Sequence, residues 1–201
     1  MAKIKFTKTE LKKQQDAKKQ FERFLPTLQL KKQQLQMEVR RSMELLAENA
    51  RKLAKFEESL AGIAALFGPE ADAGVVFAAV AVERVRRGEL NIAGITVPTF
   101  EGVDFKLAAV DLLATDWYVD DAIAAVKSAV ELREAKRVLE ERCALLNAEL
   151  VGTSQRVNLF EKVKIPECKE NIRRIGIMLG DANTSAVARC KIAKKKSAPA
   201  A

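Results

Sequence analysis

The sequence lacks the residues from which most enzyme active sites are built. It contains no histidine, which excludes Ser–His and Cys–His nucleophile pairs, HExxH zinc sites and histidine acid–base catalysis. The phosphate-binding patterns GxxxxGK[ST] and GxGxxG are also absent. Cys143, Cys168 and Cys190 form no CxxC pair, and their odd number favours reduced thiols. We therefore expect a non-catalytic protein that holds no metal and no cofactor.

Aromatic residues and long apolar runs are scarce as well. Aromatics make up 5% of the chain, whereas charged residues make up 31%. Together with abundant Ala, Leu, Lys, Glu and Gln, this composition favours elongated helices over a compact globule. No apolar run approaches the ~20 residues that span a bilayer. The opening MAKIKFTKTE has no apolar signal-peptide core. These features predict a cytoplasmic protein with no transmembrane segment.

Positive charge is concentrated at the two ends of the chain. Residues 1–19 carry a net charge of +5, and residues 187–201 carry another +5 with no acid among them. The whole chain is +8, so the part between the ends carries −2. Basic ends of this kind suit nucleic acid or an anionic membrane surface. Solvated tails without a partner are the simpler interpretation of the C-terminal lysines taken alone.

A heptad repeat of apolar residues runs through the first third of the chain. Ten of its thirteen positions are apolar. The three exceptions are Lys32, Ser42 and Asn49, and polar positions such as Ser42 and Asn49 often fix the register. A repeat of this length predicts a coiled-coil helix, because helices of globular proteins average about three turns. The repeat comprises Leu25, Leu28, Lys32, Leu35, Val39, Ser42, Leu46, Asn49, Leu53, Phe56, Leu60, Ile63 and Phe67.

The C-terminal half carries a matching repeat that changes phase near Pro166. Before the proline, the positions are Leu139, Cys143, Leu146, Leu150, Thr153, Val157 and Phe160. After the change, they are Ile165, Cys168, Ile172, Ile175, Leu179 and Ala182. Proline removes a backbone donor and costs about 3 kcal/mol inside a helix. We therefore predict a kink or stutter at Pro166 that keeps the apolar face turned inward.

The segment between the two repeats has a different composition. Residues 68–118 carry four bases against eight acids and contain five of the nine glycines. The imperfectly alternating stretch 80–86 and the β-branched stretch 90–97 predict a β-hairpin, with a turn at Arg87–Gly88–Glu89, a bulge at Gly94 and an end at Pro98. A short helix is expected near 106–113. An irregular loop is the alternative.

These patterns predict a mainly α fold. The N- and C-terminal segments form a long antiparallel two-helix coiled coil, and the central insert contains a short β-hairpin and a short helix. The expected divisions are an N-terminal helix over 1–67, the insert over 68–118, a C-terminal helix over 119–186 and a basic tail over 187–201.

Several motifs, in this order, resemble the D subunit of V-type (V/A-type) ATP synthases, in its bacterial branch. The opening FTKTELKKQQ, the insert LNIAGITVPTFEGVDF and the stretch RVNLFEKVKIPE each resemble the corresponding part of that family. The resemblance covers nearly the whole chain. The residues that carry the C-terminal signature are Arg156, Val157, Asn158, Phe160, Glu161, Ile165 and Pro166.

The resemblance implies a central-stalk rotor shaft that couples ATP synthesis or hydrolysis in a catalytic ring to ion translocation in a membrane sector. The implied partners are the catalytic and regulatory ring subunits, and a small central-stalk subunit and a membrane-proximal collar subunit that both dock on the insert. No direct contact with nucleic acid is implied. The alternative from charge alone is a basic coiled-coil adaptor for nucleic acid or anionic membrane. Candidate ring-contacting residues are Lys3, Lys5, Lys8, Lys12, Arg189, Lys191, Lys194, Lys195 and Lys196.

Overall fold

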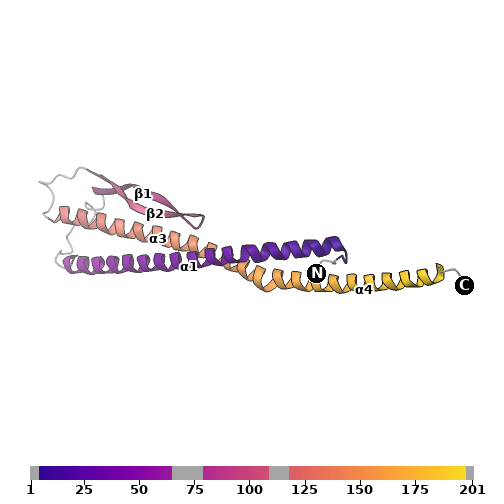
Figure 1. Cartoon of the computed structure of the whole chain (residues 1–201). Coiled ribbons are helices and arrows are strands. Elements are labelled where there is room, and N and C mark those ends of the chain that lie inside the picture. The colour runs from indigo at the N-terminus through magenta and orange to yellow at the C-terminus, as the bar shows by residue number, and fades with distance from the viewer. Residues whose placement is uncertain (1–4, 65–78, 109–117, 198–201) are drawn as a thin grey trace. The chain divides into compact units, whose positions relative to one another are not determined.

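The structure is a computed structural model that describes residues 5–64, 79–108 and 118–197 (Figure 1). Its elements in chain order are the helix α1 (Lys8–Ala64), the strands β1 (Val80–Ile92) and β2 (Ile95–Leu107), the helix α3 (Val119–Leu159), the π-helical turn η1 (Phe160–Lys164) and the helix α4 (Ile165–Ser197). They divide into two compact units. The terminal unit comprises Met1–Lys32 and Gly152–Ala201, and the insert unit comprises Gln33–Val151.

The predicted coiled-coil face of α1 is confirmed. All eleven repeat positions from Leu25 to Leu60 are buried or partly buried, and Leu35, Val39 and Ser42 are fully inside. The side chains of Ile63 and Phe67 lie outside the described part. At the start of the helix, the backbone N–H of Glu10 donates to Thr7 Oγ1 at 3.2 Å. This is the first half of a capping box, and it explains why TKTE begins a helix.

Helices pair in antiparallel fashion within each unit, as predicted. In the terminal unit, the rings of Phe21 and Phe160 lie 5.0 Å apart. Further toward the start of α1, Gln14 accepts a hydrogen bond at 3.4 Å from Asn171, which lies further along the C-terminal segment. In the insert unit, the ion pairs Glu38–Arg142 at 3.5 Å and Glu57–Arg133 at 3.4 Å likewise run in opposite chain directions.

The β-hairpin is confirmed, but its predicted turn was wrong. The chain reverses at Ala93 and Gly94, whose φ angles of 52° and 83° are both positive, as a type I′ turn requires. Asn91 Oδ1 supports the turn by accepting from the Gly94 N–H at 3.1 Å. Gly88, predicted to be in the turn, instead lies inside β1, where a Cβ atom would come within 2.7 Å of Thr99 Oγ1. A side chain at this position would require the cross-strand side chains of Thr99 and Glu101 to shift.

Pro98 lies within β2 and does not end it, which corrects the second boundary. The pair Ile92–Ile95 flanks the two-residue turn and is therefore hydrogen-bonded, so alternation makes the pair Glu89–Pro98 a non-hydrogen-bonded one. The proline nitrogen then faces the outer edge of the hairpin and breaks no bond of the ladder. The predicted short helix near 106–113 starts inside β2, which continues to Leu107, and residues 109–113 lie outside the described part.

The core of the insert unit joins the tip of the hairpin to both helices. Leu35 and Val39 from α1, Val97 from β2 and Leu146 from α3 form one buried cluster. The partly buried residues that pack against this cluster are Ile92, Ala93, Ile95 and Leu150. None of the helices in the described ranges combines the length and the hydropathy of a membrane-spanning segment.

Candidate functional site

The signature stretch from Arg156 to Pro166 contains the π-helical turn η1, Phe160–Lys164. The backbone N–H of Ile165 donates to the carbonyl of Phe160, five residues earlier, whereas an α-helix would use the residue four earlier. The turn holds one residue more than an α-helical turn would. Such turns are rare and are frequently found at functional sites.

This surplus residue accounts for the phase change seen in the sequence. An unbroken heptad would place the residues after Phe160 at 164, 167, 171 and 174, and the apolar positions are each one residue later. The structure buries Ile165, Cys168 and Ile175, which are 8%, 6% and 0% exposed. The predicted stutter is therefore confirmed as a π turn next to Pro166. The predicted face ends at Leu179, because Ala182 is exposed.

The energetic reason for the π turn lies in the side chains that an α-helix would present. A continuous α-helix would turn Lys164, Glu167 and Arg174 toward α1 in place of the apolar set. Burying Ile175 alone is worth about 1.5–3 kcal/mol, and leaving an unpaired charge in that position would cost more. Pro166 has no N–H to give to the preceding turn, so it loses little by following an irregular one.

Side chains around the π turn show how this region is held. Burial raises the pKa of the Cys168 thiol, so the thiol stays neutral and packs as an apolar group. One turn later, hydrogen bonds from Arg173 at 2.8 Å and Arg174 at 2.9 Å lower the pKa of Glu170 to about 2. The apolar side faces α1, and the ion pairs lie on the exposed side of α4.

The structure describes all the candidate ring-contacting residues except Lys3. They lie near the N-terminal end of α1 and near the C-terminal end of α4, in the terminal unit. The described members are exposed: Lys5, Lys8, Lys12, Arg189, Lys191, Lys194, Lys195 and Lys196. Lys3 lies outside the described residues. Every side chain from Asp181 to Lys196 is exposed, and Figure 1 shows this end of α4 continuing past the start of α1. The two basic groups therefore belong to one unit, on separate helices.

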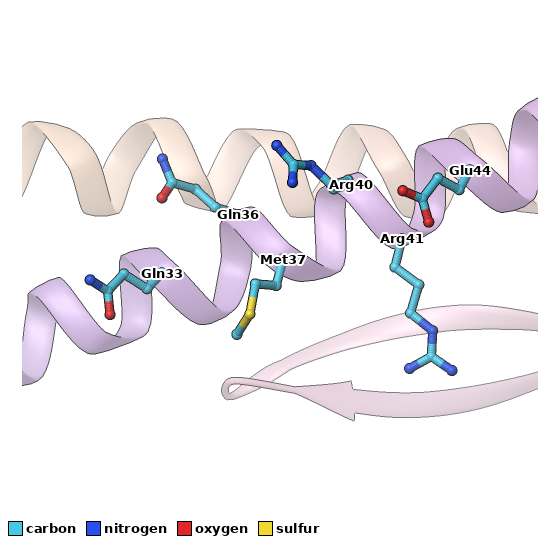
Figure 2. A pocket seen from close by; sticks show the side chains of 6 residues that line it. All are labelled: Gln33, Gln36, Met37, Arg40, Arg41 and Glu44. Atoms are coloured by element: carbon cyan, nitrogen blue, oxygen red, sulfur yellow. The ribbon is translucent and has the colours of Figure 1, made fainter.

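A second exposed surface, on α1 in the insert unit, has no signal in the sequence and was not predicted. Six side chains at helical spacing line a shallow hollow of ≈ 960 Å³ (Figure 2): Gln33, Gln36, Met37, Arg40, Arg41 and Glu44. Met37 is 65% exposed, and Figure 2 shows it and Arg41 directed to the side of α1 where the hairpin lies. From sequence alone, this stretch is indistinguishable from an ordinary solvated helix face. Its open shape and mixed amide, cationic and thioether groups suit a protein surface better than an enclosed ligand.

Comparisons with known proteins agree with the order of the motifs. The family model for the D subunit of ATP synthase matches residues 10–195. A protein of Borreliella burgdorferi, named as the D subunit of a V-type ATP synthase, is 42% identical over 200 residues, covering 96% of this chain and 95% of that protein. Proteins with the same name from Chlamydia pneumoniae (32% identical, 96% of this chain and 92% of that protein) and Chlamydia trachomatis serovar L2 (33%, 96% and 95%) are also similar. The chain belongs to the family of V-type ATP synthase D subunits, as the resemblance of its motifs indicated.

Proposed function

We propose that this chain is the rotor shaft in the central stalk of a V/A-type rotary ATPase. As a non-catalytic subunit, it couples ATP synthesis or hydrolysis in the catalytic ring to ion translocation in the membrane sector. The observation that carries this proposal is the match to a V-type ATP synthase D subunit over 96% of the chain. Paired helices support it, because a shaft has to transmit torque without unfolding.

The basic ends of the terminal unit are the proposed contact with the ring. The last three lysines of α4, Lys194, Lys195 and Lys196, are exposed, and an exposed ion pair is worth about 1 kcal/mol or less. Several weak, solvated contacts suit a shaft that must turn, because strong fixed ion pairs would resist each step. Their summed field still steers the shaft into an acidic opening.

The insert unit is the proposed contact with the small central-stalk subunit and the membrane-proximal collar. Two surfaces are available there: the hollow on α1 between Gln33 and Glu44, and the hairpin, which carries Arg84, Arg86 and Arg87 on β1. Through these partners the protein is held at the periphery of the membrane on its cytoplasmic side. No direct contact with nucleic acid is part of this proposal.

Neutralising the end of α4 tests the proposal. We expect Lys194→Gln, Lys195→Gln and Lys196→Gln together to weaken binding to the purified catalytic ring by up to about a hundredfold at low ionic strength, and less at high salt. The matched control is Arg51→Gln, Lys52→Gln and Lys55→Gln, three exposed bases of α1 in the insert unit. The control should leave ring binding unchanged. If the lysine variant keeps ring binding and ATP-driven rotation but loses affinity for DNA or anionic vesicles, the chain is a basic adaptor.

A further inference from the structure

We propose that η1 is a built-in hinge of the C-terminal helix, a short segment that opens locally while the helix on each side of it stays closed. The surplus residue that sets the phase of α4 also makes this turn weaker than the buried stretches of helix on either side of it. The hinge is a property of the isolated chain and does not depend on the chain being a rotor shaft.

The first support is the pattern of backbone hydrogen bonds in the helix. Ile165 donates to Phe160 across the wider π spacing. The next residue, Pro166, has no N–H, so a carbonyl of η1 loses the donor that any other residue would supply. Two consecutive backbone hydrogen bonds of the helix are thus altered. The first spans five residues, and the second has no donor.

The second support is burial. None of the five η1 residues is buried, and Leu159 and Val163 are 43% and 49% exposed. The nearest buried positions are Val157 and Ile165, which are 4% and 8% exposed. Residues 161–164, between the partly buried Phe160 and the buried Ile165, open at low cost, because opening them exposes little new apolar surface.

The third support is the set of contacts that lets the turn close again in the same register. Phe160 packs against Phe21 of α1, with ring centroids 5.0 Å apart. Lys164 pairs with Glu167 at 3.4 Å across the proline. Asn171 of α4 is held further along by its hydrogen bond to α1 at 3.4 Å. A shift of α4 into the α-helical phase would replace apolar seam residues by charged ones, so the turn opens and recloses without slipping.

Amide hydrogen exchange on the full chain, followed by mass spectrometry, tests the hinge. We expect the amides of residues 161–165 to exchange at least about tenfold faster than those of 150–157 and 168–175. Deleting Val163 removes the surplus residue, and Pro166→Ala restores the missing donor. In the double variant we expect one continuous α-helix with the same buried seam and no fast-exchanging segment.

Two length-preserving variants separate the causes. Pro166→Ala alone keeps the surplus residue, so we expect it to keep at least half of the excess exchange rate, and Val163→Ala should behave as the wild type. If the wild-type turn exchanges as slowly as its flanks, the hinge is excluded. If Pro166→Ala alone abolishes the fast exchange, the opening is caused by the proline and not by the surplus residue, and the proposed origin of the hinge is wrong.

Discussion

The two units of the chain use paired helices in different surroundings. In the insert unit, a hairpin covers the helix pair, and Leu35, Val97 and Leu146 are each 0% exposed. In the terminal unit, burial is confined to one seam of the C-terminal helix against α1, and every side chain from Asp181 to Lys196 is exposed. Both regions are nevertheless helical.

The comparison shows that a segment can form a helix without contributing to a buried core. The end of α4 is rich in Ala and Lys, which have high helix propensity, so it stays helical without burial. Two paired helices alone can bury only one stripe of each helix. The hairpin packs on the pair as a third layer and allows further side chains to be buried. We therefore expect changes in the insert unit to alter stability and changes at the end of α4 to alter mainly partner binding.

The largest expected effect is at Leu146. We expect Leu146→Ala to lower the free energy of unfolding by about 2–5 kcal/mol, because it leaves a cavity in the core of the insert unit. Chemical denaturation followed by circular dichroism measures this. The control is Leu145→Ala on the same helix, whose side chain is 41% exposed, and it should cost less than about 1 kcal/mol. Equal costs at the two positions would contradict the assigned core.

The three cysteines probe burial along the C-terminal helix. Cys143 in the insert unit and Cys168 in the terminal unit are buried, while Cys190 is exposed. Burial raises the pKa of both buried thiols, so little reactive thiolate forms near neutral pH. We expect maleimide to label Cys190 at least about a hundredfold faster than the other two in the folded chain. In denaturant all three should react alike, and a fast Cys143 in native buffer would show that this position of α3 is not protected in the folded chain.

A smaller effect is expected at the hairpin turn. Gly94 has a φ of 83° and open space around it, so a side chain there would be strained but would not clash. We expect Gly94→Ala to cost about 1–2 kcal/mol, measured by thermal unfolding. Gly176→Ala is the matched control, because Gly176 also has open space but lies inside α4. That control should be stabilising by about 0.5–1 kcal/mol.

The smallest effect is expected at Glu170 on the exposed side of α4. Its pKa falls from 4.5 to about 2 because Arg173 and Arg174 donate to it. The folded pKa is the lower one, so the stabilisation is complete above pH 4.5 and is lost as the pH falls through 2. We expect Glu170→Gln to lower the unfolding midpoint slightly at neutral pH and not at all once the pH is below the folded pKa. Glu161→Gln, a change at another exposed acid of this unit, is the control, and the same pH dependence there would contradict this assignment.

The sequence alone was enough to predict both helices, their antiparallel pairing and the phase change near Pro166. These features follow from the spacing of the apolar residues, because a buried helix face places apolar residues at every third or fourth position of the sequence. The family also followed from the sequence, because its motifs occur in order along one chain. The hairpin was predicted, but its turn was placed at Gly88. A glycine inside a strand, such as Gly88, looks the same in sequence as a glycine needed for a turn, such as Gly94.

What only the tertiary structure decided is how those patterns are satisfied in space. The sequence showed a change of phase near Pro166 and left a kink or a stutter open, whereas the structure has a π turn there. Packing of Ile165, Cys168 and Ile175 against α1 selected the π turn, because it alone keeps both the helix and the apolar face. The same holds for Val97, which is fully buried only because β2 folds onto Leu35 and Leu146. Period is a property of the local chain, whereas the partner of each buried side chain is decided by residues distant in the sequence.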